Sequence, residues 1–68
     1  MIDVSRDEIE YLIDQHIIGR NAERDRAILK RRLIDGIYFE PLAEEFNLSV
    51  RQTKNIVYKR LQQLTKYF

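Results

Sequence analysis

Residues 40–61, EPLAEEFNLSVRQTKNIVYKRL, decide the fold of this 68-residue chain. They predict two helices joined by a short break at residues 47–49. Pro41 suits the first turn of a helix, where its missing amide donor costs no hydrogen bond. In the break, Asn47 tolerates a left-handed backbone and Ser49 is a good N-cap for the helix that follows. The stretch therefore predicts a helix-turn-helix.

Two further helices are expected before this stretch. Ser5 and Glu8 have the spacing of a capping box, apolar residues follow at helical spacing, and Gly19 is a natural stop. Asn21 can cap a second helix that ends before the turn-forming Asp35-Gly36 pair. The expected fold is therefore all-α, one small four-helix domain covering residues 1–68. Its helices are expected at about residues 5–18, 22–35, 41–46 and 50–66.

The composition fits a small helical domain and excludes several other classes. Aliphatic and aromatic residues make up 44% of the chain and charged residues 34%, which argues against disorder. No apolar run is long enough to span a membrane, and the first residues carry no signal-peptide pattern. Because the chain has no cysteine, disulfides and thiolate–zinc sites are excluded, and a cytoplasmic location is expected.

The net charge of +1 hides a segregation of acids and bases along the chain. Residues 1–19 hold five acids and one base, whereas residues 47–68 hold five bases and no acid. An ordinary solvated helix face more often mixes the two signs, so the basic C-terminal block favours a polyanion-binding surface. A plain solvated surface is the alternative interpretation.

The helix expected at residues 50–66 has two faces. Its inward stripe is expected to contain Thr53, Ile56, Val57, Arg60, Leu61 and Leu64. Four polar residues recur at i, i+3, i+4 and i+7 and therefore share another face: Arg51, Lys54, Asn55 and Tyr58. In a helix-turn-helix the second helix enters the major groove, where arginine and lysine donate to guanine or phosphate and asparagine pairs with adenine.

Double-stranded DNA is therefore the predicted partner. The residues expected to contact base edges are Val50, Arg51, Lys54 and Asn55. Those expected to contact the sugar-phosphate backbone are Gln52, Tyr58 and Lys59. The cations expected to extend the positive surface are Arg20, Lys30 and Arg31.

No catalytic or metal site is expected. His16 is the one histidine of the chain, and zinc needs three or four converging ligands. Asp7 and Glu8 are adjacent on a helix and point in different directions, so they cannot act as a paired acid and base. Ser49 is a cap with no base placed near it. The chain is therefore predicted not to be an enzyme and to need no cofactor.

Over nearly its full length the chain resembles region 4 of the sigma-70 family. The resemblance is carried by residues 6–13 (RDEIEYLI), 22–33 (AERDRAILKRRL), 42–49 (LAEEFNLS) and 53–56 (TKNI). That family uses a four-helix domain to bind the −35 promoter element and to contact RNA polymerase. The resemblance therefore implies a transcriptional regulator of bacterial or phage type, with RNA polymerase or another transcription protein as a second partner.

Two departures from the family pattern narrow this expectation. The family usually has a charged residue where Val50 stands and often an acid where Arg51 stands, which implies a different DNA target. Segments that bind the −10 element are missing, so a complete sigma factor is not expected.

LuxR-type C-terminal domains are also similar across residues 49–64, and they dimerise through their last helix. This similarity leaves a homodimer as an open alternative. So do four aromatic residues that can take part in a contact between two copies: Tyr11, Tyr38, Tyr67 and Phe68.

Two other functions compete with specific DNA binding. In the first, the acidic helix at residues 5–18 docks RNA polymerase, a sigma factor or a phage protein, and DNA binding is weak or nonspecific. In the second, the chain is a small structural protein whose basic helix binds polyanions without sequence preference. The acidic helix also has a simpler interpretation, a solvated face that neutralises the basic helix after it.

Overall fold

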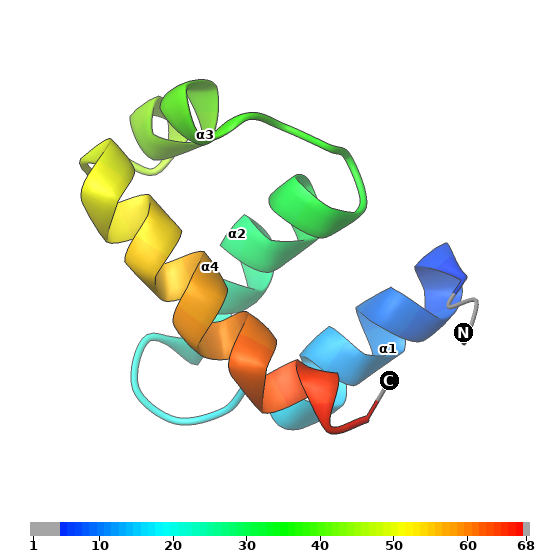
Figure 1. Cartoon of the computed structure of the whole chain (residues 1–68). Helices are drawn as coiled ribbons and strands as arrows, with labels where there is room; N and C mark the ends of the chain where they lie inside the picture. The colour runs from blue at the N-terminus through cyan, green and yellow to red at the C-terminus, as the bar shows by residue number, and fades with distance from the viewer. Residues whose placement is uncertain (1–4, 68) are drawn as a thin grey trace.

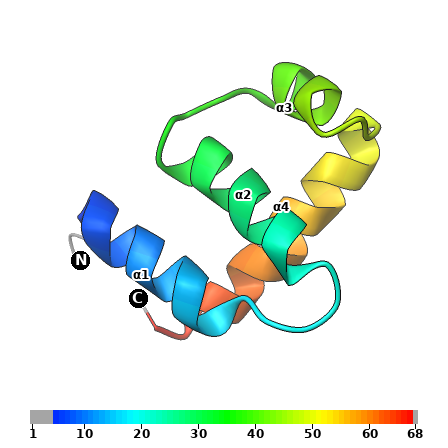
Figure 2. The same cartoon turned by 180° about the vertical axis from the view of Figure 1, so that it is seen from behind.

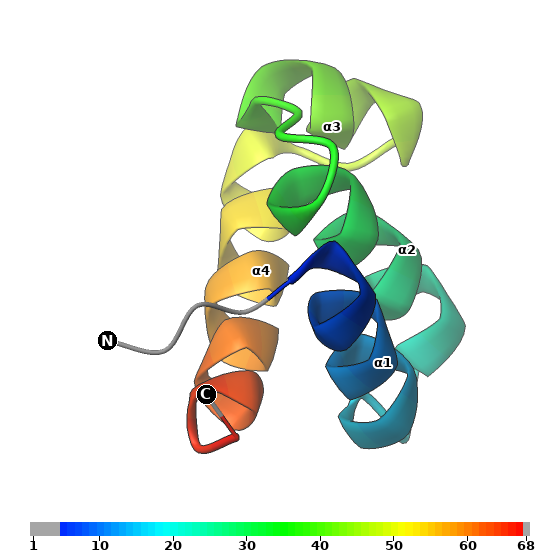
Figure 3. The same cartoon turned by 90° about the vertical axis from the view of Figure 1, so that its right-hand side faces the viewer.

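A computed structural model describes residues 5–67, and within that range the protein is all-α (Figure 1). The helices are α1 (Arg6–His16), α2 (Ala22–Leu33), α3 (Phe39–Glu45) and α4 (Val50–Thr65). α2 lies between α1 and α3, as the view from behind also shows (Figure 2). α4 packs against the other three helices, with α3 near its beginning and α1 near its end (Figure 3). The expected all-α, four-helix fold is confirmed.

The apolar core lies where α4 meets the other helices. Its fully or almost fully buried members are Ile13, Ile17, Ile28, Leu29, Leu42, Val57 and Leu64. The inward stripe expected for α4 is confirmed, because Thr53, Val57, Arg60 and Leu64 are buried. The two remaining members, Ile56 and Leu61, are half-buried. None of the helices within residues 5–67 is both long and apolar enough to cross a bilayer.

α1 ends two residues earlier than expected. Ile17 leaves helical geometry with φ −89° and ψ 98°, and Gly19, the expected stop, lies beyond the helix with φ 92°. Two adjacent β-branched residues, Ile17 and Ile18, disfavour a further helical turn. The extended backbone also places the Ile17 side chain fully inside the core, while its carbonyl accepts a hydrogen bond from Arg26 Nε at 2.8 Å.

The ends of α2 and α3 also differ from expectation. Asn21 does not cap α2 with its side chain, because its backbone is left-handed (φ 60°, ψ 20°) and its amide group makes no capping bond. α2 ends at Leu33 and not at residue 35. α3 begins at Phe39, two residues before Pro41. Proline fits there as well, because the first amides of a helix have no intrahelical acceptor.

The break before α4 has the expected chemistry. Asn47 is left-handed with φ 56°. The Ser49 hydroxyl accepts a hydrogen bond from the backbone N–H of Gln52 at 3.0 Å. In return, the side-chain oxygen Oε1 of Gln52 accepts one from the backbone N–H of Ser49 at 2.9 Å. This reciprocal pair is a capping box, and it fixes where the chain turns into α4.

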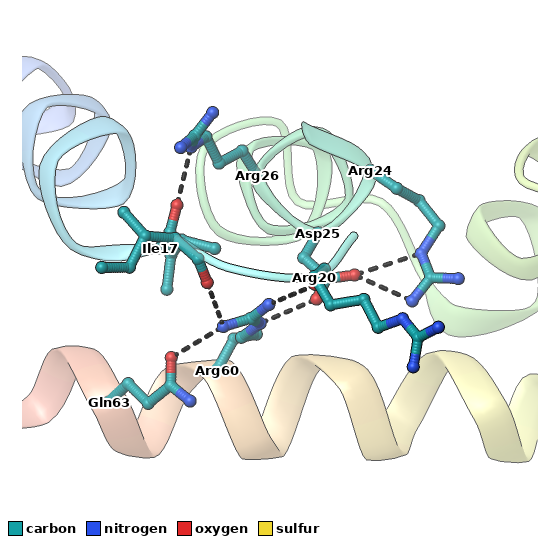
Figure 4. A network of polar contacts seen from close by, with 8 residues as sticks. Ile17, Arg20, Arg24, Asp25, Arg26, Arg60 and Gln63 are labelled. Atoms are coloured by element: carbon teal, nitrogen blue, oxygen red, sulfur yellow. Dashed lines mark hydrogen bonds and ion pairs between the residues drawn. The ribbon is translucent and has the colours of Figure 1, made fainter. Parts of the chain in front are cut away.

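Arg60 is buried in the stripe because a network of acceptors surrounds it (Figure 4). Its Nε donates to Asp25 Oδ2 on α2 at 2.7 Å, and both residues are more than nine-tenths buried. Its Nη1 and Nη2 donate to the carbonyls of Ile18 and Arg20 at 3.2 and 3.0 Å. The other oxygen of Asp25, Oδ1, accepts from Arg24 Nε at 3.1 Å. The network therefore fastens α2 and the α1–α2 loop to the middle of α4.

Tyr67 joins the end of α4 to the end of α1. Its ring stacks on His16 with the ring centroids 3.6 Å apart and the planes 8° from parallel. The Tyr67 ring is therefore engaged within the chain, although the residue is 45% exposed. Tyr11 and Tyr38 are 61% and 74% exposed, as expected, and Phe68 lies outside the described residues.

Candidate nucleic-acid interface

The burial of the inward stripe fixes which face of α4 meets solvent. Arg51, Lys54, Asn55 and Tyr58 are all exposed, and Lys59 is exposed beside them. The structure therefore brings together on one helix the polar side chains that the sequence singled out. Val50 differs from them, because it is the first residue of α4 and half-buried.

Gln52 is exposed but already has one structural role. Its Oε1 accepts the Ser49 amide hydrogen in the capping box. The side-chain NH₂ group is the part of Gln52 left to donate to a phosphate oxygen. Gln52 can therefore contact DNA only through that group while the capping box is intact.

The cations on the outer face of α4 have no acidic partner among the residues that the structure describes. Arg51, Lys54 and Lys59 form no ion pair with any carboxylate of residues 5–67. The face has no acid of its own, because the sequence from Asn47 onwards contains none. Its positive charge is therefore available to an external anion.

Lys30 and Arg31 do not extend this positive surface as expected, because each is paired with acids. Lys30 Nζ lies 2.8 Å from Asp14 Oδ1 on α1. Arg31 lies 2.9 Å from Glu45 on α3 and 3.0 Å from Asp35. The hydrogen bonds to Glu45 and then to Asp35 raise the pKa of Arg31 above its ordinary value, as expected for a guanidinium that donates to two carboxylates.

An aromatic ring of α3 borders the outer face of α4. The Nζ atom of Lys54 lies 5.6 Å from the centre of the Phe39 ring, and the Tyr58 ring meets Phe39 edge-on with centroids 5.9 Å apart. The Arg32 guanidinium of α2 lies over the same ring, 4.5 Å from its centre. We call these four residues the Phe39 cluster. The sequence interpretation missed Phe39 because it placed residue 39 before the third helix, although the bulky run of residues 37–39, one residue before Pro41, signals a packed segment.

The acidic surface of α1 lies on a different part of the molecule. Asp7, Glu8 and Glu10 are exposed. A groove of about 290 Å³ runs beside them and is lined by Asp7, Glu8, Tyr11, Leu12 and Tyr67. The groove combines negative charge with aromatic and aliphatic surface, whereas the outer face of α4 combines positive charge with amide and hydroxyl groups.

No group of three or more His, Asp, Glu or Cys side chains suited to a metal ion occurs in the part of the chain that the structure describes.

Compared with models of known protein families, with curated protein sequences and with solved structures, the chain shows no match. The case for a function therefore rests on the residues and their geometry.

Proposed function

We propose that this protein is a sequence-specific binder of double-stranded DNA that acts in transcription regulation, as the sigma-70 region 4 resemblance implies. α3 and α4 serve as a helix-turn-helix, and α4 enters the major groove. One observation carries the proposal. Arg51, Lys54 and Lys59 share one helix with exposed Asn55 and Tyr58 and have no carboxylate partner within residues 5–67, whereas Lys30 and Arg31 of α2 are paired.

The roles within this face follow from the chemistry of the side chains. Arg51 can donate two parallel hydrogen bonds to guanine, and Asn55 can exchange two with adenine. These two residues lie in the first turns of α4, the part of a recognition helix that contacts base edges. Tyr58 and Lys59 lie further along and suit phosphate oxygens. Half-buried Val50 suits contact with a thymine methyl group.

A titration of labelled duplexes followed by fluorescence anisotropy tests the proposal. We expect binding at low salt that weakens as salt rises, since each neutralised phosphate contributes about 0.9 to the slope of log K against log salt. Changing Arg51 to Ala should weaken binding, whereas Gln15→Ala on the exposed surface of α1 should not.

The same titration also separates DNA binding from its rivals. Lack of binding to any duplex at low salt would contradict the proposal. Equal affinity for random duplexes, selected duplexes and an unrelated polyanion would favour the nonspecific structural role. If no duplex is bound and a separate capture experiment shows tight binding to RNA polymerase, a second candidate function, docking of another protein by α1, would be favoured.

That second candidate is a protein-docking role for α1, and the groove beside Tyr11 favours it. A partner segment with an aliphatic anchor and flanking lysine or arginine residues would match its acids and its apolar lining. Charge reversal at Asp7, which lines the groove and forms no ion pair within residues 5–67, tests this role, whereas reversal at Asp14 would also release Lys30. Capture of purified bacterial RNA polymerase that is lost with Asp7→Lys would support the role, and unchanged capture would contradict it.

A further inference from the structure

We infer that Arg32 and Lys54 bind one backbone phosphate together, on the surface provided by the Phe39 cluster. This inference rests on the proposed function, because the phosphate belongs to the DNA that α4 contacts. It adds Arg32, which lies on α2, to the interface, and it changes the expected role of Lys54 from a base contact to a backbone contact.

Three helices bring the Phe39 cluster together. Arg32 comes from the last turn of α2, Phe39 is the first residue of α3, and Lys54 is the fifth residue of α4. Both cationic groups lie within 6 Å of the Phe39 ring centre, at 4.5 and 5.6 Å, where the ring face attracts positive charge. Arg32 Nη1 also donates to the Ile37 carbonyl at 3.1 Å, which fixes the guanidinium against the α2–α3 connection.

The charges in the cluster remain unbalanced. An aromatic ring attracts cations but carries no net charge, so it cannot neutralise two of them. Neither Arg32 nor Lys54 has an ion pair with a carboxylate in the described chain, residues 5–67. Glu40 follows Phe39 directly, but successive residues point about 100° apart on a helix, and Glu40 forms no ion pair in that range. Two cations that lie within 6 Å of the centre of one ring, with no carboxylate partner in residues 5–67, are suited to the two unesterified oxygens of a single phosphodiester group.

The position of Lys54 on α4 fits a backbone contact better than a base contact. Its ammonium group is held over Phe39 of α3, on the flank of the exposed face. Asn55 is the next residue and points about 100° further round the helix, away from that flank. Helix-turn-helix proteins place side chains from the flanks of the recognition helix on phosphates and those at its centre on base edges. Arg51 and Asn55 are therefore left as the principal base contacts.

The Arg32 side chain keeps donors for this purpose. A guanidinium has five N–H donors, and the Ile37 carbonyl takes one at Nη1. Arg32 is half-buried, so its position is set before DNA arrives and little side-chain freedom is lost on binding. Arg31, one residue earlier on the same helix, donates its hydrogen bonds to Glu45 and Asp35. The two neighbouring arginines therefore make a matched pair, one available and one engaged.

The test compares Arg32→Gln with Arg31→Gln, which remove the same charge from adjacent positions. Duplex affinity is measured by anisotropy between 0.05 and 0.2 M KCl, after circular dichroism shows that both variants fold. Arg32→Gln should weaken binding roughly five- to tenfold at about 0.1 M salt, and the double variant Arg32→Gln/Lys54→Gln should reduce the salt slope by about 0.9, the value for the one phosphate that the two residues share. Arg31→Gln should leave the slope unchanged. Phe39→Leu, which keeps an apolar side chain but removes the ring, should give a smaller loss.

Sequence preference then separates a backbone contact from a base contact. Lys54→Gln should weaken selected and random duplexes by the same factor, as loss of a phosphate contact does. A change in the preferred sequence with Lys54→Gln, or an unchanged slope with the double variant Arg32→Gln/Lys54→Gln while Asn55→Ala still alters preference, would overturn this inference and leave the proposed function standing. Failure of the unmodified protein to bind any duplex would overturn both.

Discussion

At the scale of single residues, Asp25 and Arg60 show how a charged pair can belong to a core. Removing an ionised group from water is costly unless a partner and further hydrogen bonds replace the water. Here Asp25 accepts from Arg60 and Arg24, and Arg60 donates to three further oxygens besides. Within residues 5–67 no buried side-chain nitrogen or oxygen lacks a hydrogen-bond partner. The hydrogen-bonding groups of both side chains are therefore satisfied. Removing one of the two residues should lower the free energy of unfolding, because the other is then buried without its partner.

We expect Asp25→Asn to destabilise the fold by about 3 kcal/mol, because it leaves Arg60 buried without a counterion. The control is Asp14→Asn, which removes an exposed partner of Lys30 and should cost less than about 1 kcal/mol. Urea unfolding followed by circular dichroism measures both free energies of unfolding. Similar small losses for the two variants would mean that the buried pair does not hold α2 to α4.

From the sequence, only one member of this pair, Arg60, could be recognised as a charge in the core. Arg60 falls on the apolar stripe of its helix, which marks it as a charge that needs a partner. The partner stands 35 residues earlier, on another helix, and no local spacing connects the two. A second charge at an inward position, Asp25 among the apolar residues of α2, is the one signal that would have suggested the match. Pairing across helices depends on how the helices pack, and that is not a local property of sequence.

At the scale of elements, the helix beginnings with side-chain caps were the most predictable features. Ser49 and Gln52 form the capping box of α4, and α4 begins where the sequence placed it, at Val50. Ser5 caps α1 by accepting from the Glu8 backbone N–H at 3.2 Å, but the Glu8 carboxylate accepts from the Ser5 hydroxyl at 3.3 Å, so the expected capping box is only half formed. The beginning of α3 was misplaced because proline is tolerated at several positions of a first helical turn and so does not mark one of them.

Gln52→Glu separates the structural role of α4 from its proposed role in DNA binding. A glutamate at the third position of the helix still completes the capping box, and its charge is favourable near the helix N-terminus. The melting temperature should therefore stay the same or rise. A negative charge beside Arg51 should nevertheless weaken duplex binding severalfold. A fall in melting temperature comparable to that of Ser49→Ala, or unchanged DNA affinity, would contradict this account of α4.

At the scale of the whole molecule, the fold decides which charges face outward unpaired. The sequence predicted the basic C-terminal block, but it also assigned Lys30 and Arg31 to the positive surface. Packing of α2 between α1 and α3 places both beside carboxylates, at 2.8 and 2.9 Å. The cations that form no ion pair within residues 5–67 therefore include Arg51, Lys54 and Lys59 of α4, Arg32 of α2 beside Phe39, and exposed Arg20 of the α1–α2 loop. The charge pattern along the chain predicts that the proposed interface is positive, and the packing of the helices decides which cations are free to take part in it.

The most direct measurement of the central claim is selection of duplexes from a randomised pool by the unmodified protein and by Asn55→Ala. The unmodified protein should enrich a short common sequence, and Asn55→Ala should lose preference at one position within it, where the wild type prefers adenine. Gln62→Ala serves as the control, because Gln62 is exposed on α4 about two turns beyond Asn55, and it should recover the unaltered sequence. Enrichment of no common sequence, or an identical sequence with Asn55→Ala, would contradict specific recognition of DNA by α4.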